Sequence, residues 1–303
     1  RFDIREELRP FPVLPQPEKE IRFENERMRL VISKETGLIE SYRVDGMEYA
    51  GQGFGTLEVF GDNEDPWGMA DNLYSSRPLG RFQLVKDPRR AAQIAACAVP
   101  ELAPVRVIEW GDVLVKVEAI MEYQGSTAIV QYEANRFGTE VRMNIRLING
   151  LKDRMVKLML PLGFRAEAYR GKTMFGINDL DMTGVETVSQ EYVWAQNHRQ
   201  ALSVFKTGCY GGHFKDNALA LTLLRGAAYC AHPIEDRRIL PPDRFSERMD
   251  QGERLFSFVL KASATAERVA AMERESQVHQ QPCQIVCYFP GGDGREQKPL
   301  MTI

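Results

Sequence analysis

Short runs of alternating apolar and polar residues recur along the chain, and they constrain its fold more than any other feature. Val113, Val115 and Val117 share one side of an extended segment, while Lys116 and Glu118 share the other. This period of two is that of a half-buried β-strand. Similar runs occur at residues 21–26, 28–33, 38–44, 56–60, 105–109, 128–132, 141–147, 155–160, 202–205, 219–224 and 255–260.

Turn-forming residues separate these runs. Asp45-Gly46 is a strong hairpin signal between two strand-like segments, and Gly252 suits a tight turn before residues 255–260. Short strands separated by Gly and Asn/Asp turns are typical of two packed sheets. No regular alternation of strand and helix patterns occurs, which argues against doubly wound parallel folds. The sequence therefore predicts an all-β sandwich.

Helical spacing is limited to one segment. Residues 264–277 place Ala266, Val269 and Met272 at roughly helical intervals, with charged residues between them, and Thr265 could cap this helix. Residues 89–92 are interpreted as a loop, as are the glycine-rich residues 51–55, which no helix follows to present amides to a phosphate. We expect one or two short helices in total.

The N-terminal residues 1–20 have a different character from the rest. Prolines are closely spaced in residues 9–17, which favours an extended backbone that cannot continue a helix. We interpret residues 1–20 as an interdomain connector and residues 21–303 as one β-domain. No apolar core of a signal peptide and no run of about 18 apolar residues is present, so no membrane partner is expected.

The net charge and the cysteines limit which partners the chain is expected to bind and which cellular compartment suits it. The net charge of −3 and the pI near 6.0 give no basic surface for nucleic acid. Five scattered cysteines do not form a disulfide framework, which favours a reducing cytoplasm. Cys283 and Cys287 could join His279 in a zinc site, but small buried apolar side chains are the favoured interpretation, and no cofactor is expected in this chain.

One segment carries residues suited to binding sugars, and a second is better suited to a structural turn. Residues 61–72 combine several acids with Trp67, and carboxylates can hold sugar hydroxyls while an indole packs on the apolar face of the ring. The competing interpretation is that the acids bond turn amides and Trp67 fills the core. Residues 247–254 precede a strand, and there Asp250 fits a structural corner better than it fits chemistry.

Several segments resemble, in chain order, the C-terminal half of glycoside hydrolase family 38, the α-mannosidases. Besides residues 24–26 and 35–39, the similar elements are residues 65–69 (the family's Asp-Ala-Trp-Asp-Ile, with Asp62 upstream), 109–113 (Glu-x-Gly-Pro-Val), 212–214 (Tyr-Gly-Phe), 219–225 (Leu-Thr-Leu-Leu-Arg) and 250–252 (Asp-x-Gly). The resemblance covers roughly residues 20–262. Gly68, Asp112 and Arg254 depart from the family's usual Asp, Pro and His.

This resemblance implies a large supersandwich, similar to the galactose mutarotase-like fold, attached to a zinc-dependent catalytic barrel. The family's nucleophile, acid/base and zinc ligands lie in the barrel, and none maps onto this sequence. We therefore expect a non-catalytic, carbohydrate-associated domain of a retaining α-mannosidase, whose partners are its own barrel and mannose-containing glycans. The residues expected to contact sugar are Trp67, Asp71, Arg248 and Asp250.

Three other functions remain open on the sequence alone. The chain could be a carbohydrate-binding module with Trp67 or Trp110 on its surface. It could be a mutarotase-like epimerase, which needs a base such as His198 or His213 beside an acid. It could also be a structural interaction domain without sugar affinity.

Overall fold

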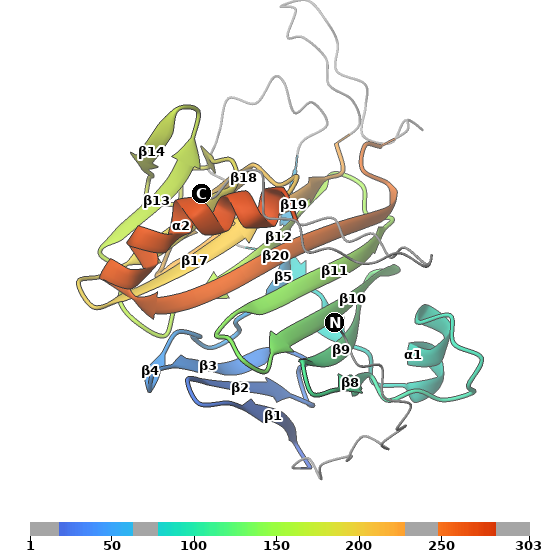
Figure 1. Cartoon of the computed structure of the whole chain (residues 1–303). Helices are drawn as coiled ribbons and strands as arrows, with labels where there is room; N and C mark the ends of the chain where they lie inside the picture. The colour runs from blue at the N-terminus through green and yellow to red at the C-terminus, as the bar shows by residue number, and fades with distance from the viewer. Residues whose placement is uncertain (1–17, 63–77, 228–247, 283–303) are drawn as a thin grey trace, which may run out of the picture.

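The computed structural model describes residues 18–62, 78–227 and 248–282 of the chain (Figure 1). In these residues the large sheet has the strand order β14-β13-β16-β17-β20-β11-β10-β9-β7, and β8 also pairs with β9. The bounds of its strands are β7 Gln83–Leu84, β8 Val105–Trp110, β9 Leu114–Tyr123, β10 Ser126–Asn135, β11 Val141–Asn149, β13 Ala168–Thr173, β14 Gly176–Asp179, β16 Tyr192–Gln196, β17 Gln200–Lys206 and β20 Gly252–Ala264.

Two smaller sheets complete the β-structure of the described residues. A six-stranded sheet has the order β15-β18-β19-β12-β5-β6, and a four-stranded sheet has the order β1-β2-β3-β4. Their strands are β1 Glu20–Glu24, β2 Met28–Ser33, β3 Ile39–Val44, β4 Met47–Glu48, β5 Thr56–Gly61, β6 Gly80–Arg81, β12 Arg154–Pro161, β15 Thr187–Val188, β18 Gly211–Lys215 and β19 Ala218–Arg225.

One continuous core lies between the sheets. The large sheet contributes Val130 and Met143, the six-stranded sheet contributes Leu158 and Leu221, and the four-stranded sheet adds Tyr42, all within one buried cluster. The alternation predicted for residues 113–118 holds within β9, where Val115 and Val117 point into this core, but Val113 precedes the strand and is exposed. The predicted all-β sandwich is confirmed.

The predicted hairpin at Asp45-Gly46 is present between β3 and β4. Both residues have positive φ, +50° and +79°, as the two central residues of a type I′ hairpin turn require. The N-terminal strand β1 begins at Glu20, the last residue of the predicted connector, whereas residues 1–17 lie outside the described part.

Strand β20 occupies a central position in the large sheet. It pairs antiparallel with β11 on one side and with β17 on the other. Phe258, Leu260 and Ala262 point into the core, and Val259 points to the opposite face. A strand from the last third of the described chain therefore joins two halves of the sheet.

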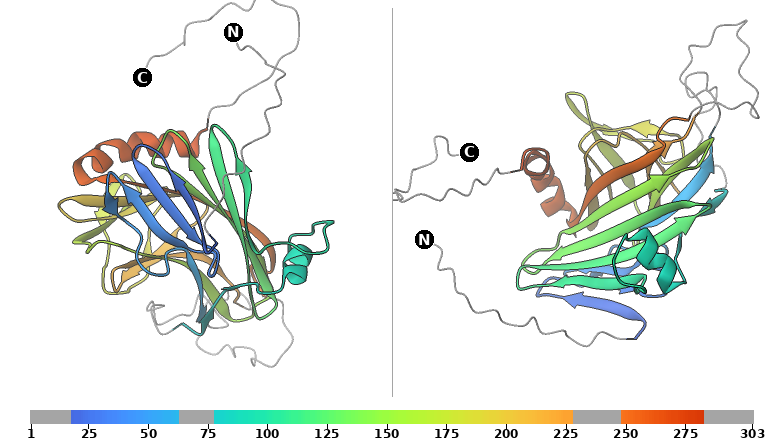
Figure 2. Two further views of the ribbon diagram at one scale, coloured as in Figure 1. Left: turned by 90° about the horizontal axis from the view of Figure 1, so that it is seen from below. Right: turned by 90° about the vertical axis from the view of Figure 1, so that its right-hand side faces the viewer.

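Two helices cover parts of the outer face of the large sheet (Figure 2). Helix α2 (Thr265–Gln280) packs Met272 against Trp194, Phe205 and Val259. It extends a few residues beyond the predicted helix. Its N-cap is Ala264, so the expected cap at Thr265 is wrong; the Thr265 hydroxyl donates to the carbonyl of Asn197 instead.

The second helix corrects a sequence prediction. Residues 89–92, expected to form a loop, belong to α1 (Pro88–Ile94). Asp87 caps this helix by accepting a hydrogen bond from the backbone N of Arg89 at 2.9 Å, and Ala91 packs on the β9–β10 region of the sheet. No helix of the described residues is both long and apolar enough to span a membrane.

Candidate functional site

One end of the six-stranded sheet holds Arg248 and Asp250, the two expected sugar contacts that lie in the described part of the chain. Strands β5 and β19 both pair antiparallel with β12, so they run in the same direction and end together at Gly61 and Arg225. The chain continues from β5 through Asp62 into residues 63–77. Trp67 and Asp71, two of the expected sugar contacts, lie in that segment, outside the described residues.

An ion pair closes this end of the sheet. The guanidinium of Arg225 donates through Nε to Oδ2 of Asp62 at 2.8 Å and through Nη2 to Oδ1 at 2.6 Å. The Asp62 side chain is fully buried. Two parallel charge-assisted bonds fix both groups in position, so the chain enters residues 63–77 from a rigid point.

A second ion pair lies beside the first. Arg248 donates to Asp153 through Nε at 2.9 Å and through Nη2 at 3.1 Å, and the backbone N of Asp62 donates to the carbonyl of Asp153. Arg248 directly follows residues 228–247, which also lie outside the described part. Asp153 therefore connects the described ends of both segments.

Asp250 forms the corner that its sequence predicts. It has a φ of +52°, Gly252 has a φ of +84°, and the carbonyl of Asp250 accepts a hydrogen bond from Nδ2 of Asn149 at 2.9 Å. Its carboxylate accepts from the backbone N of Arg225 at 3.3 Å. The structure thus brings Arg248 and Asp250 together, in positions that hold the turn before β20.

The Arg248–Asp153 pair makes a measurable prediction. Arg248→Lys is expected to lower the free energy of unfolding by about 1.5–3 kcal/mol, because a single ammonium group cannot span both carboxylate oxygens of a mostly buried pair. Urea unfolding followed by circular dichroism measures the change. Arg146→Lys is the matched control: Arg146 binds Glu253 with the same two distances, 2.9 and 3.1 Å, but on the exposed surface. An equal loss in both variants would contradict the prediction.

A buried polar cluster lies on the outer face of the same sheet. The ammonium of Lys157 contacts the Glu186 carboxylate and lies 3.0 Å from Nδ1 of His213, while Thr222 donates to Glu186 at 2.5 Å. Lys157 is completely buried. We call these four residues the Lys157 cluster. A β-bulge between Val156 and Lys157 interrupts the register there.

The charges of the Lys157 cluster depend on one another. Burial acts to raise the pKa of Glu186, but hydrogen bonds from His213 and Thr222 and the charge of Lys157 hold it below its ordinary value. Burial lowers the pKa of Lys157, and the charge of Glu186 opposes that shift. The favoured state is therefore an ionised carboxylate held by buried donors.

The two histidines considered as epimerase bases differ in their surroundings. His213 does lie beside an acid, with Nδ1 3.4 Å from Glu186, but it is only 3% exposed and Lys157 holds the same ring nitrogen. His198 is 74% exposed and lies 3.5 Å from Glu167. His213 is thus closed off from a substrate, whereas His198 and Glu167 lie together on the exposed surface.

Two further candidates are placed by the structure. Trp110 is partly buried against the core: its ring meets Phe23 edge-on, and the guanidinium of Arg136 covers it at 5.3 Å. It is therefore no open platform for a sugar ring. His279 packs on Phe205 at 4.8 Å between ring centroids, whereas Cys283 and Cys287 lie outside the described residues.

Sequence reasoning missed the Lys157 cluster. The one available signal was a lysine at the centre of the apolar run in residues 155–160, a position where a charged group requires a partner. Its partner Glu186 lies in the irregular segment before β15. That segment has no periodic pattern from which the position of Glu186 could be predicted.

Comparisons with known proteins agree with this fold. The model of the family "Glycosyl hydrolases family 38 C-terminal domain" matches residues 23–243. No curated protein matches the chain in sequence. Among solved structures, an alpha-mannosidase from Enterococcus faecalis V583 superposes with a TM-score of 0.65 at 13% identity, covering 86% of this chain and 31% of that one.

A second solved structure, a family 38 glycosyl hydrolase protein from Enterococcus faecalis, has a TM-score of 0.65 at 14% identity, covering 89% of this chain and 33% of that one. A galactose 1-epimerase from Lactobacillus acidophilus has a TM-score of 0.44 at 10% identity, covering 81% of this chain and 94% of that one. The chain thus spans about a third of the length of the two family 38 structures. It belongs to glycosyl hydrolase family 38, as that family's C-terminal domain.

Proposed function

We propose that this chain is the non-catalytic, carbohydrate-associated domain of a retaining, zinc-dependent α-mannosidase that acts in the cytoplasm. The family match over residues 23–243 is the observation that carries this proposal. Retaining hydrolysis needs two carboxyl groups across one glycosidic bond, one as nucleophile and one as acid and then base. We assign both groups, and the ligands of the zinc that supplies Lewis acidity when bound, to a catalytic barrel outside this chain.

The ion-paired end of the six-stranded sheet supports a role for this domain beside the substrate. Asp62 directly precedes residues 63–77, and Arg248 directly follows residues 228–247. Their partners Arg225 and Asp153 fix both positions with paired hydrogen bonds. We infer that this anchoring positions the two segments at the edge of the catalytic cleft, where Trp67 and Asp71 contact the mannoside.

The carboxylates at this end are suited to holding the scaffold. Asp62 and Asp153 each bind a guanidinium, and Asp250 bonds a backbone amide. Carboxylate oxygens engaged in these bonds hold neighbouring segments of the chain in fixed positions. Arg248 and Asp250 are therefore proposed as positioning residues.

Hydrolysis of an aryl α-mannoside tests the non-catalytic assignment. The purified chain, incubated with 4-nitrophenyl α-mannoside and added zinc, is expected to release nitrophenol at the rate of buffer alone. Turnover by this chain would contradict the proposal. The coding sequence upstream gives an independent test, since we expect a barrel with paired Asp residues and a His-x-Asp metal motif there. An unrelated upstream region would remove the mannosidase assignment.

A further inference from the structure

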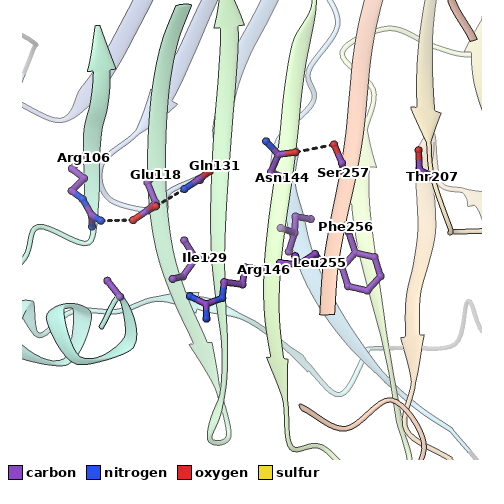
Figure 3. Close-up of a pocket in the computed structure, with 12 residues that line it drawn as sticks. Arg106, Glu118, Ile129, Gln131, Asn144, Arg146, Thr207, Leu255, Phe256 and Ser257 are labelled. Carbon is purple, nitrogen blue, oxygen red and sulfur yellow. Dashed lines mark hydrogen bonds and ion pairs between the residues drawn. The ribbon is translucent and has the colours of Figure 1, made fainter. Parts of the chain in front are cut away.

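A second polar surface lies on the outer face of the large sheet, away from the core and the ion-paired end. Helix α1 covers Ile120 near one side of the sheet, and α2 covers Phe205 and Val259 near the other. Between them a cavity of about 540 Å³ lies open (Figure 3). Small-molecule sites typically have volumes of roughly 300–1,000 Å³.

A row of polar side chains crosses this cavity in register. Neighbouring strands pair Arg106 with Glu118, Glu118 with Gln131, Gln131 with Asn144, and Asn144 with Ser257. All five side chains line the cavity, as Figure 3 shows. We call these five residues the polar stripe.

Hydrogen bonds within the polar stripe fix its side chains. Arg106 forms an ion pair with Glu118, and Nε2 of Gln131 donates to Glu118 at 2.7 Å. The Ser257 hydroxyl donates to Oδ1 of Asn144 at 2.8 Å. These contacts hold the groups in place before a ligand arrives, which lowers the entropy lost on binding.

The polar stripe retains unused hydrogen-bonding capacity. The carbonyl oxygen of Gln131 accepts no bond from the described residues, and the Ser257 oxygen keeps its lone pairs for a donor. Nη1 of Arg106 is buried and donates to none of the described residues. Such unsatisfied groups cost stability unless water or a ligand completes them.

An apolar strip runs parallel to the polar stripe, two residues along each strand and so about 7 Å away. It consists of Ile129 and Leu255. The aliphatic part of Arg146 lies between them, because Arg146 pairs with Ile129 on one neighbouring strand and with Leu255 on the other. Leu255 is 73% exposed, although it lies in the central strand β20. A ligand seated here would therefore meet hydrogen-bonding groups along one edge and hydrocarbon along the other.

The charge of the cavity selects for a neutral ligand. Arg106 is neutralised by Glu118, and Arg146 at the rim is neutralised by Glu253. The charged residues among the described lining are therefore all ion-paired, and none is left over to bind a charged group of a ligand. A sugar ring has this combination of properties: hydroxyls at its rim, an apolar C–H face, and no charge.

We propose that the polar stripe binds a neutral carbohydrate of one or two rings. Hydroxyl groups bond Gln131 and Ser257, and the C–H face packs on Leu255. This inference extends the proposed carbohydrate association of the domain. It requires neither a catalytic region nor residues 63–77, so the domain can hold a glycan at a place remote from hydrolysis.

Calorimetric titration of the purified chain tests the site. The probes are methyl α-mannoside, an α-linked mannobiose and methyl β-galactoside, and saturable binding of at least one is expected. Gln131→Leu should weaken that binding at least tenfold, since it removes the free acceptor while keeping the side-chain size. Ser257→Ala, which removes one hydroxyl, should weaken it less. Both variants are checked for an unchanged thermal transition, and Ser257→Ala serves alone if Gln131→Leu is unstable.

Arg170→Gln is the control, because it breaks an ion pair with the exposed Asp179 on the surface and leaves the polar stripe intact. Its binding should stay within twofold of the original chain. Absence of saturable binding by all three sugars overturns the site, as does binding that the stripe variants leave unchanged. Either result leaves the proposed mannosidase role standing, since that role is tested by hydrolysis and by the upstream sequence.

Discussion

A chain that ends at residue 247 is expected not to fold, although it contains every residue matched by the family model. The missing strand β20 lies between β11 and β17, so its removal leaves two unpaired edges inside the large sheet. The truncation also removes Phe258 and Leu260 from the core, and it removes α2, which covers Phe205. Each such buried side chain contributes about 1.5–3 kcal/mol, and whole domains are stable by only about 5–15 kcal/mol.

Circular dichroism and size-exclusion chromatography measure this effect. The truncated chain should show no cooperative thermal transition and should elute as an expanded or aggregated species, while the complete chain melts cooperatively. Leu255→Ala provides the control within the same strand, because that side chain is mostly exposed and its loss should leave the transition almost unchanged. A cooperative melt of the truncated chain would show that β20 is dispensable.

Lys157→Met is expected to lower the free energy of unfolding by about 3–5 kcal/mol. The substitution keeps the length of the side chain but leaves the carboxylate of Glu186 buried without its ammonium partner. His213 loses its neighbour at Nδ1 at the same time. Chemical unfolding at pH 7 measures the loss. Lys172→Met is the control, since Lys172 pairs with a half-exposed Glu273 at the surface and should contribute far less.

The pH dependence of stability distinguishes this electrostatic effect from simple loss of packing. The pKa of Glu186 in the folded chain lies below its ordinary value of 4.5. Its contribution to stability is therefore complete above pH 4.5 and is lost as the pH falls through the lower, folded value. Without Lys157 that pKa rises, so the loss on acidification should begin at a higher pH. An identical pH profile for the two proteins would assign the effect to packing.

The strands of the sandwich could be predicted because the alternation of apolar and polar residues shows which face of each strand is buried. All twelve strand-like runs of the sequence correspond to strands of the described structure, from β1 to β20. The strands that sequence reasoning missed are mostly short or lack alternation. In β16 four successive residues are buried, because α2 covers the face that would otherwise be polar. Two-residue strands such as β6 and β15 carry no period at all.

The candidate site was only partly predictable. The sequence indicated Arg248 and Asp250, and the structure places both at the same sheet end as Asp62. It could not reveal Asp153 or Arg225 as their partners, because those contacts join residues 95 and 163 positions apart. Local patterns do not encode such pairings. Trp67 and Asp71 lie outside the described residues, so their role stays a prediction.

The common direction of β5 and β19 has an evolutionary consequence. Both segments that lie outside the described part, residues 63–77 and 228–247, start from the same end of the six-stranded sheet. Insertions or exchanges in either one would leave the pairing of the described strands untouched. Under the proposed function, relatives could diversify the glycans they prefer by altering these two segments, while selection maintains the paired strands independently.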